Sequence, residues 1–405
     1  MPASPRPIPR EQLDIACKTR SNLFAWRGQF SPQLVEVLIR SYAPPRALVL
    51  DPFVGSGTVL YEAGLLGLQA VGAEINPAAV SMARVYELIN MAHLQRLELL
   101  AQIDRDLRAC PAEDMPLFRA DGSPVPQGGL LEELVGLAKA CEPGPRRGVL
   151  EALVTLTDDY PNRPGPALIY SKWGALRRVA SDLPYSAAPI RALVADARRL
   201  PLPKATVDFV VSSPPYINVF NYHQQYRAAA ELLGADLLRV ARSEIGANRK
   251  HRQNRFLTVV QYCLDMAAVL GELKRVCKRG APVVLVVGRV SNVRKTAFFN
   301  SDIIETLATD CVGFSCPLRQ ERVFTNRFGL RIYEDVLHLV NDGSRVLPAN
   351  CSPRRVGYYA LKSARNRAPE EAKADLDDSI AMADRVEESP VLDPCRDRDE
   401  MLAKE

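Results

Sequence analysis

The stretch "DPFVGSGT", residues 51–58, decides how the rest of this 405-residue sequence is interpreted. It directly follows "RALVL", an apolar run that is typical of a short buried strand. Gly55 and Gly57 therefore follow a strand end, where glycine lets the backbone turn sharply and approach a ligand without a Cβ in the way. A helix starting near Thr58 would offer free amide donors. The loop is a candidate ligand site; the alternative is a turn that only packs strand against helix.

Two acidic residues narrow the class of ligand. Asp51 leads into the loop, and Glu74 ends the next expected strand in "VGAEINP", about twenty residues later, where dinucleotide folds place the acid that binds ribose hydroxyls. A phosphate-binding loop would continue with Lys and Ser or Thr, but "GSGTVLYE" has no lysine. An aspartate suits a cationic amino group instead. An amino group, a ribose and no pyrophosphate favour S-adenosylmethionine over NAD.

The order of the expected elements predicts the fold class. Apolar strand patterns alternate with helical patterns from "ALVL" onward, which is typical of an α/β fold with a parallel sheet and helices on its faces. A long amphipathic helix is expected around "FLTVVQYCLDMAAVLGELKRVC". The expected strands cover residues 47–50, 69–75, 190–196, 207–213, 280–288 and 333–340.

Three regions depart from this alternation. Residues 1–20 are rich in proline and predict an extended N-terminal arm. Residues 91–190 carry helical stretches between loops rich in Pro and Gly, and we interpret them as a mainly helical insertion. Residues 346–405 lose hydrophobic periodicity and are rich in Asp and Glu, which predicts a disordered acidic tail.

The composition fits a globular cytoplasmic protein. Hydrophobic residues make up 47% of the chain and charged residues 24%, and the net charge of +5 is too mild to indicate a nucleic-acid partner by itself. The sequence has no apolar run of about 20 residues and no signal peptide at its start. The nine cysteines are scattered without a CxxC pair, so we expect free thiols and no metal site.

A second motif, "SSPPY", leaves the strand "VDFVV" at the same expected edge of the sheet. Pro214 and Pro215 have fixed φ angles and make a rigid loop with outward carbonyls. The Ser213 hydroxyl and a proline carbonyl would accept the two N–H bonds of an exocyclic amino group, and Tyr216 would stack on its ring, worth roughly 1–3 kcal/mol. The alternative is a proline-rich turn around a buried tyrosine.

Together, "DPFVGSGT" and "SSPPY" resemble the motifs of the DNA amino-methyltransferases, which methylate cytosine N4 or adenine N6. The resemblance extends over about residues 20–340, through "RGQFSPQLVEVLI" before the first motif and "VADARRLPLP" after the insertion. It implies a Rossmann-like, seven-stranded, mostly parallel sheet in a domain of residues 21–345. The insertion at 91–190 is then a candidate for target recognition.

The resemblance also implies roles for individual residues. Serine in the first place of the (D/N/S)PP(Y/F) motif is typical of cytosine-N4 enzymes. The cofactor would be S-adenosylmethionine, with Phe30 near its methionine end and Asp196 at its adenine. The implied catalytic residues are Ser213, Pro214, Pro215 and Tyr216, and the implied cofactor-binding residues are Phe30, Asp51, Phe53, Gly55, Gly57, Thr58, Glu74 and Asp196.

Two features depart from the family pattern. In the commonest cytosine-N4 arrangement the catalytic motif precedes the cofactor motif, whereas here it follows. The insertion also lies between the second expected helix and Asp196, which is not where the family most often has its target-recognition region. The resemblance therefore implies no particular DNA recognition sequence.

The resulting hypothesis is a site-specific DNA methyltransferase that flips cytosine out of the duplex and methylates N4 without a covalent intermediate. DNA is the expected partner, and a cognate restriction endonuclease is a candidate partner in a bacterial or archaeal cell. The rivals are an adenine-N6 enzyme, an RNA guanine-N2 methyltransferase and a catalytically inactive nucleic-acid-binding module. The basic loop "ARSEIGANRKHRQNRF" is either a solvated loop or a phosphate contact. Its candidate DNA-binding residues are Arg249, Lys250, Arg252 and Arg255.

Overall fold

Seven strands form one sheet that brings the two sequence motifs to neighbouring positions. The computed structural model describes residues 5–110, 129–159, 161–217, 222–246, 251, 253–326, 329–342 and 351–392. The strand order is β3-β2-β1-β4-β5-β9-β8. The strands are β1 (Leu48–Asp51), β2 (Gln69–Glu74), β3 (Ile190–Val194), β4 (Phe209–Ser212), β5 (Pro282–Gly288), β8 (Ser315–Thr325) and β9 (Arg331–Val340).

The first five strands of the sheet pair in parallel, and β9 is the one described strand of the sheet that runs in the opposite direction. β1 pairs in parallel with β2 and β4, β2 with β3, and β4 with β5. β9 is antiparallel to both β5 and β8. The predicted α/β fold with a mostly parallel seven-stranded sheet is therefore confirmed. Because β1 and β4 are parallel neighbours, the loops that follow them leave the same edge of the sheet.

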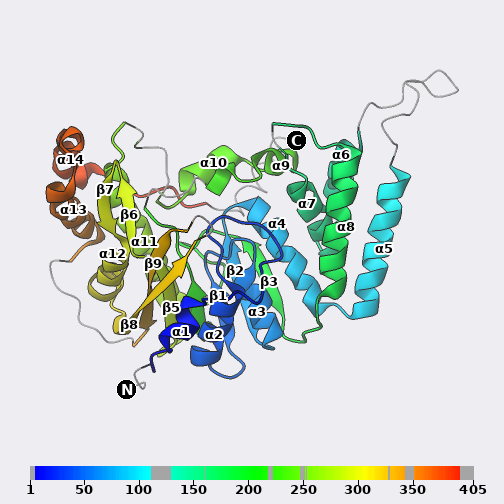
Figure 1. Ribbon diagram of the computed structural model, residues 1–405, viewed down its shortest axis with the longest axis horizontal. Coiled ribbons are helices and arrows are strands. Elements are labelled where there is room, and N and C mark those ends of the chain that lie inside the picture. The colour runs from blue at the N-terminus through cyan, green and yellow to red at the C-terminus, as the bar shows by residue number, and fades with distance from the viewer. Residues whose placement is uncertain are drawn as a thin grey trace.

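Helices cover both faces of the sheet (Figure 1), and alternating apolar residues of the central strands pack against them. Val49 and Val211 belong to one buried cluster, which includes residues of α2 and α3, whereas Leu50 and Val210 belong to another, which includes residues of α11. Near-continuous apolar strands are expected where both faces of a parallel sheet are covered. The helices packed on the sheet are α2 (Pro32–Tyr42), α3 (Thr58–Leu65), α4 (Pro77–Val85), α11 (Leu257–Val276) and α12 (Asn300–Thr306).

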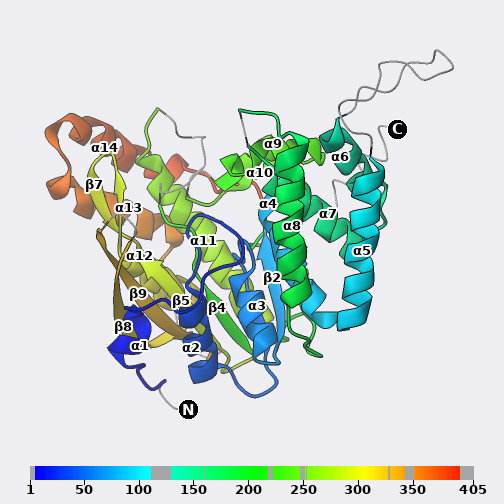
Figure 2. The ribbon, with the colours of Figure 1, turned by 45° about the vertical axis from the view of Figure 1, so that its right-hand side comes forward.

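The region predicted as a helical insertion contains four helices beside α4 (Figures 1 and 2). These are α5 (His93–Ala109), α6 (Leu130–Ala140), α7 (Pro145–Leu156) and α8 (Pro166–Asp182). Their inner faces, including Leu134, Leu150 and Trp173, join the same buried cluster as α2 and α3. The insertion is therefore packed onto one end of the sheet. Every helix in the described ranges is too short or too polar to span a lipid bilayer.

The first residues of the described chain are not a free arm. Residues 10–14 form α1 (Arg10–Asp14), which packs against β8. Arg322 Nε of β8 donates to the carbonyl of Leu13 at 2.7 Å, and Val323 N donates to Asp14 Oδ1 at 2.7 Å. The segment predicted as an extended arm thus includes a helix that covers the edge strand, because the edge leaves backbone groups to be paired.

The prediction of a disordered tail is wrong for residues 351–392. This segment forms α13 (Pro353–Ala364) and α14 (Glu370–Met382), and α13 packs on α11. A Cβ on Gly357 of α13 would lie 2.8 Å from Val260 Cα of α11, so this helix approaches closely through small residues. The tail lacks a hydrophobic pattern because glycine and alanine make much of its contact.

Residues 386–392, which we call the tail latch, continue from α14 back to the sheet. Ser389 Oγ and N donate to the two carboxylate oxygens of Asp265 at 2.7 and 2.9 Å. The carbonyls of Ser389 and Pro390 accept from Arg198 at 2.8 and 2.9 Å, and Leu392 N donates to Asp196 Oδ2 at 2.9 Å. Five hydrogen bonds thus tie the tail latch to charged residues that are almost fully buried.

The remaining elements are short and lie above and beside the sheet. A hairpin of β6 (Val290–Val293) and β7 (Thr296–Phe299) follows β5. The other helical segments are η1 (Tyr86–Asn90), η2 (Tyr222–Gln224), α9 (Arg227–Leu232), α10 (Leu237–Ser243), η4 (Leu307–Val312), η5 (Arg365–Arg367) and η6 (Ala383–Arg385).

Candidate active site

The loop that follows β1 begins with a buried carboxylate. Asp51 is 3% exposed, and its Oδ1 accepts hydrogen bonds from Ser212 Oγ at 2.5 Å and Phe53 N at 3.0 Å. Burial raises the pKa of Asp51 to about 7, although both hydrogen bonds act to lower it. The protonation state of the Asp51 carboxyl group should therefore change near neutral pH, and a cationic ligand group would favour its charged form.

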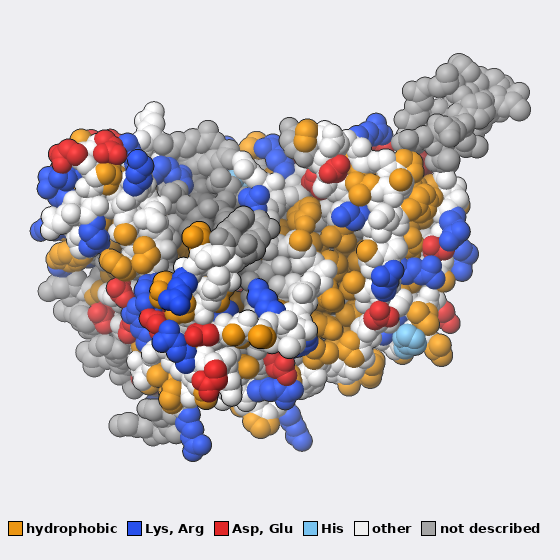
Figure 3. Space-filling model, viewed as in Figure 1, with side chains coloured by type: hydrophobic (Ala, Val, Ile, Leu, Met, Phe, Trp, Pro, Cys, Tyr) orange, Lys and Arg blue, Asp and Glu red, His pale blue; other side chains and the backbone are white. Residues whose placement is uncertain are grey.

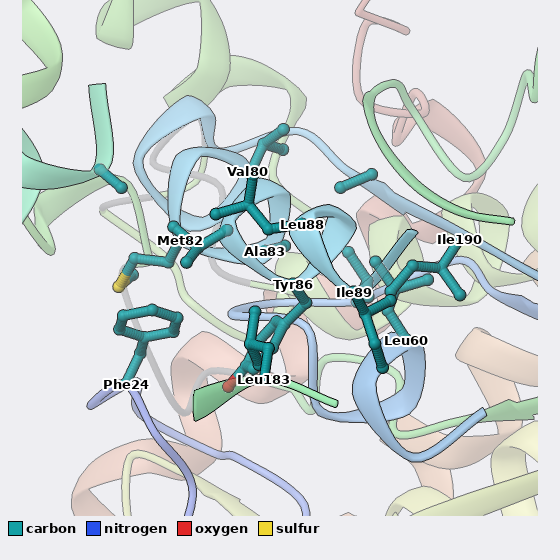
Figure 4. Close-up of a cluster of buried hydrophobic side chains, with 14 of the residues drawn as sticks. Phe24, Leu60, Val80, Met82, Ala83, Tyr86, Leu88, Ile89, Leu183 and Ile190 are labelled. Carbon is teal, nitrogen blue, oxygen red and sulfur yellow. The ribbon is translucent and has the colours of Figure 1, made fainter. Parts of the chain in front are cut away.

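The two glycines of this loop serve different neighbours. Gly55, with φ +50°, lines the pocket described below, and a Cβ there would lie 3.1 Å from the Trp26 ring. Gly57 has φ +99°, and a Cβ there would lie 2.7 Å from Tyr86 Cδ2 and 3.0 Å from Ala83 Cα. Both of these neighbours belong to the buried cluster of Figure 4. Gly57, predicted to bind the cofactor, is therefore required by packing and is not among the described residues that line the pocket.

Glu74, at the end of β2, faces the same pocket as Asp51. Its Oε1 accepts from Asn76 N at 3.0 Å. Burial raises the pKa of Glu74 to about 7, against backbone hydrogen bonds from Asn76, Gly55 and Ile75 that lower it. The acid expected at a ribose is thus held in place by the glycine loop and by Ile75 and Asn76, which directly precede α4.

A segment before α2 folds over the glycine loop. Thr58 Oγ1 donates to Asn22 Oδ1 at 3.2 Å, and Asn22 Nδ2 donates to the carbonyl of Phe30 at 2.9 Å. Gln29 donates to the buried Ser56 hydroxyl. These contacts bring Phe30 to the pocket. The role that the resemblance implies for Phe30, near the methionine end of the cofactor, stays a prediction.

The "SSPPY" segment leaves β4 next to Asp51 and contributes to the same pocket. Ser213 and Pro215 line the pocket together with Asp51 and Glu74. The carbonyl of Pro215 accepts a hydrogen bond from Tyr262 of α11 at 3.0 Å, which fixes the loop from behind. The cofactor motif and the second motif, more than 150 residues apart in the chain, therefore meet in one cavity.

Tyr216 lies behind Ser213 rather than in the wall of the pocket. Its hydroxyl is 3.1 Å from Ser213 Oγ, and its ring packs on Gly288, where a Cβ would lie 2.7 Å from Cε2. Gly246 closes the other side, since a Cβ there would lie 2.7 Å from the Tyr216 carbonyl oxygen. Tyr216 is not among the described pocket-lining residues, so its predicted stacking on a base is not what this arrangement favours.

The pocket lies at the carboxyl ends of β1, β2 and β4. Parallel sheets commonly bind ligands at this position. Of the residues predicted to bind a cofactor, the following line it: Phe30, Asp51, Phe53, Gly55, Thr58, Glu74 and Asp196.

Aromatic side chains form one wall of the pocket. Trp26 and Tyr222 both line it. The Trp26 ring is nearly parallel to the rings of Tyr222 and Tyr226, with an interplanar angle of 15° and a centroid distance of 6.3 Å in each case. Tyr226 OH donates to the carbonyl of Ala25 at 3.0 Å, which holds this wall to the segment before α2. Planar groups stack favourably on such surfaces.

Glu244 is a further pocket residue that sequence reasoning missed. It follows α10 and is 2% exposed, and its Oε2 lies 2.7 Å from His223 Nδ1. Its other oxygen, Oε1, accepts from His223 N at 2.5 Å. The pair ties α10 to η2, and Asn76 Nδ2 ties η2 to α4 through the Tyr222 carbonyl at 2.9 Å. In the sequence, the one signal for Glu244 was its position as an acidic residue within the basic loop "ARSEIGANRKHRQNRF".

Asp196 reaches the pocket, but its carboxylate is bound to the protein itself. Asp196 is 1% exposed, and its oxygens accept from Arg198 Nε at 2.9 Å and Nη2 at 2.6 Å. Arg198 Nη1 in turn donates to Asp265 at 2.9 Å. The implied contact of Asp196 with adenine stays a prediction, and the tail latch holds the residue in position.

The first part of the chain is similar to a known family. Residues 11–85 match the family described as DNA methylase. Because this match includes the loop of residues 51–58, it supports the resemblance to the DNA amino-methyltransferases. A stretch of 60 residues is 35% identical to Type II methyltransferase M.MjaII of Methanocaldococcus jannaschii, which covers 15% of this chain and 11% of that protein. The match within the DNA methylase family does not distinguish the N4 from the N6 type.

The name of a second relative indicates that it acts on tRNA. The chain is 35% identical over 88 residues to the tRNA (guanine(10)-N2)-dimethyltransferase of Methanothermobacter thermautotrophicus, covering 21% of this chain and 25% of that protein. The chain thus spans a quarter or less of the length of these two curated relatives. Among solved structures, a SAM-dependent methyltransferase of Methanosarcina mazei aligns with 77% of this chain and 98% of its own, at 14% identity and a TM-score of 0.35.

The pocket fits the cofactor of the DNA methylase family, which is S-adenosylmethionine. Among the described pocket-lining residues, Arg27 is the single basic side chain against four acids, Asp51, Glu74, Asp196 and Glu244. An acidic lining suits an ammonium group and ribose hydroxyls and disfavours a pyrophosphate. The residues that would hold the cofactor are Asp51 at the amino group and Glu74 at the ribose.

One of the four predicted DNA-binding residues lies in the described part of the chain. Arg249, Lys250 and Arg252 lie outside it, and Arg255, two residues before α11, is partly exposed. On the face shown in Figure 3, Lys and Arg side chains lie interspersed with Asp and Glu, and hydrophobic side chains gather over the insertion beside α8. In the described part of the chain, no group of three or more His, Cys, Asp or Glu residues is arranged to hold a metal ion.

Proposed function

We propose that this protein is a site-specific DNA methyltransferase that transfers a methyl group from S-adenosylmethionine to the exocyclic N4 amino group of cytosine. The flipped base would enter the pocket beside Ser213. The observation that carries the proposal is that Ser213 and Pro215 line the same cavity as Asp51 and Glu74. Serine at this place in the motif favours cytosine N4 over adenine N6.

The chemistry follows from the acceptors at this edge of the sheet. The cytosine amino nitrogen is conjugated with its ring and is a poor nucleophile. Ser213 Oγ and a proline carbonyl of the same loop would accept its two N–H bonds and favour a pyramidal nitrogen with an available lone pair. The bound cofactor supplies an activated methyl group on a sulfonium. The protein therefore contributes mainly position, and it excludes water with the Trp26 wall.

Mass spectrometry of nucleosides tests which base is modified. The gene is expressed in a host that lacks N4-methylcytosine, and host DNA and RNA are digested separately. N4-methylcytosine in DNA is the expected result, and its level should fall when Ser213→Ala is expressed. N6-methyladenine in DNA would refute the cytosine-N4 assignment and show that the protein is an adenine-N6 methyltransferase. A chain that binds DNA but leaves no mark in DNA or RNA would be a binding module.

A guanine-N2 RNA methyltransferase is the second candidate, because the tRNA-modifying relative matches more of this chain than the DNA methylase relative does. Such an enzyme would also present acceptors to an exocyclic amino group. N2-methylguanosine in host RNA, with unmodified DNA, would establish this candidate in place of the first.

The role of Ser213 is testable separately from the identity of the base. Ser213→Ala should lower the rate of methyl transfer at least tenfold and leave the affinity for S-adenosylmethionine within about twofold, since one acceptor is lost and the cofactor contacts remain. Isothermal titration and single-turnover assays measure the two quantities. The exposed Ser363→Ala on α13 is the matched control. An unchanged rate in Ser213→Ala would remove this residue from the mechanism.

A further inference from the structure

A chain of polar groups runs from Ser213 away from the pocket and into the sheet. Ser213 Oγ lies 3.1 Å from Tyr216 OH. The Tyr216 hydroxyl faces the carboxylate of Glu334 on β9, and this contact acts to lower the pKa of Glu334. Glu334 in turn forms an ion pair with Arg322 of β8, whose side chain is 7% exposed. None of these contacts beyond Ser213 and Tyr216 is part of the sequence motif.

The register of the sheet explains why these groups meet. Glu334 is paired with Gly288 of β5 on one side and with Arg322 of β8 on the other. Residues paired in this way lie on the same face of a sheet. Because Gly288 has no side chain, the Tyr216 ring occupies the space above it and its hydroxyl reaches the neighbouring strand. The glycine, the acid and the arginine thus form a built site for one tyrosine.

The charges fix the direction of each hydrogen bond. A guanidinium is always protonated, so Arg322 donates to Glu334 and favours its ionised form. An ionised carboxylate only accepts, so Tyr216 donates its proton to Glu334. The Tyr216 oxygen then accepts, and Ser213 donates to it. Ser213 Oγ consequently turns its lone pairs to the pocket, where an amino group needs an acceptor.

We propose that Glu334 and Tyr216 are positioning residues that hold Ser213 as an acceptor and receive, through it, the proton released by methyl transfer. This inference rests on the proposed function. The hydroxyl is a property of this chain, since the family motif also accepts Phe in the fourth place. The relay also gives Tyr216 a role that does not require its ring to reach the base.

The proton balance is complete within these groups. The nitrogen lone pair forms the new N–C bond, and the S–C bond electrons stay on sulfur. An N–H proton of the now cationic amino group passes to Ser213 Oγ, the Ser213 proton passes to Tyr216, and the Tyr216 proton passes to Glu334. One proton has then moved from the base to the carboxylate. The Glu334 side chain is 14% exposed, which allows the proton to be lost to solvent.

The charged and titratable groups around the relay come from three elements. Arg322 faces Glu334 from β8, Tyr222 faces Tyr216 from η2, and Tyr262 faces it from α11. Burial raises the pKa of Glu334, while Arg322 and Tyr216 act to lower it. Glu334 must be ionised to receive the proton, so the rate should fall as the pH drops through this raised pKa.

Tyr216→Phe tests the relay without disturbing the ion pair or the ring. Single-turnover transfer of tritiated methyl groups is measured on genomic DNA, and on total RNA, from a host without the gene. We expect at least a tenfold lower rate, with the affinity for S-adenosylmethionine within twofold of the unchanged protein. Tyr333→Phe is the matched control, because Tyr333 is exposed and adjacent to Glu334. A Tyr216→Phe rate within twofold of the unchanged protein overturns the proposal.

Glu334→Gln tests the proton acceptor through its pH profile. The amide still accepts a hydrogen bond but does not take up a proton at neutral pH, so the decline of the rate at low pH assigned to Glu334 should disappear. An identical decline in this variant overturns the relay while the methyltransferase activity stands. An unchanged protein that methylates neither DNA nor RNA refutes the proposed function, and the relay with it.

Discussion

The loop of residues 51–58 and the tail latch of residues 386–392 support the same pocket in different ways. The loop presents Asp51 and Gly55 directly to the pocket, and the sequence identified it at once. The tail latch is not among the described residues that line the pocket, and it holds Asp196 and Arg198 through main-chain groups. Chemistry that depends on side chains leaves a motif, whereas support given by backbone carbonyls and amides does not.

Removing the tail latch should have the largest effect. A chain that ends after Arg385 exposes Arg198, Asp196 and Asp265, which are otherwise paired and buried. Opening a buried charge network costs about 3–5 kcal/mol. We expect a loss of this size in urea unfolding and weaker binding of S-adenosylmethionine by isothermal titration.

A chain that ends after Leu392 is the control for this truncation, since it keeps all five latch contacts. It should unfold at the same urea concentration as the full chain. If both truncations are equally stable, the latch supports nothing, and the contrast with the glycine loop fails.

Gly57→Ala tests the loop as a packing element and should have the next largest effect. The added Cβ meets Tyr86 and Ala83, and the residue has φ +99°. Left-handed backbone strain and overpacking together cost about 2–4 kcal/mol. Gly67→Ala is the control, because Gly67 has φ +68° with open space around it. It isolates the backbone strain of roughly 1–2 kcal/mol. Equal losses in thermal unfolding would refute the packing role of Gly57.

The pH dependence of cofactor binding should be the smallest of these effects. The pKa of Asp51 is raised from 3.8 to about 7, and the ammonium group of the cofactor favours the ionised form. Binding should therefore weaken as the pH falls below 7, by up to tenfold per unit, about 1.4 kcal/mol. Titrations between pH 5.5 and 8, all in one buffer system, measure this slope. Asp51→Asn should bind weakly with a flatter slope; an unchanged slope would exclude Asp51 as its origin.

The raised pKa of Asp51 affects the stability of the cofactor-free protein in the opposite direction from cofactor binding. Because the folded state holds the Asp51 proton more tightly than the unfolded chain, stability from this group is present at low pH and is lost as the pH rises from about 4 to 7. The expectation is a decline in the free energy of unfolding across this range, which Asp51→Asn should reduce and to which the buried Glu74 contributes with the same sign.

The sequence predicted the parts of the fold whose residues alternate or cluster by hydrophobicity. β1, β2, β4 and β5 are apolar runs buried on both faces, and the structure has them where they were expected. β8 was not predicted, because its residues "SCPLRQERVFT" are largely polar and carry a proline, as suits an edge strand. The tail helices were missed because Gly357 and alanines make their contacts.

The candidate site was predicted to a similar extent. Asp51, Glu74 and Ser213 lie where the motifs indicated. Glu334 was not predicted, since its place beside Tyr216 depends on strand register across β5, β9 and β8. Glu244 depends equally on how α10 folds back to His223. Such pairings join residues far apart in the chain, and no local pattern records them.

The tail latch also orders events during synthesis of the chain. Leu392 follows Asp196, its hydrogen-bond partner, by 196 residues. At about 5–20 residues per second, translation needs roughly 10–40 s to add them. Through this interval Arg198 and Asp196 lack the backbone groups that later surround them. The wall of the pocket at Asp196 is thus completed only after Leu392 has been added, so a product that terminates before the tail latch would carry both sequence motifs without the finished site.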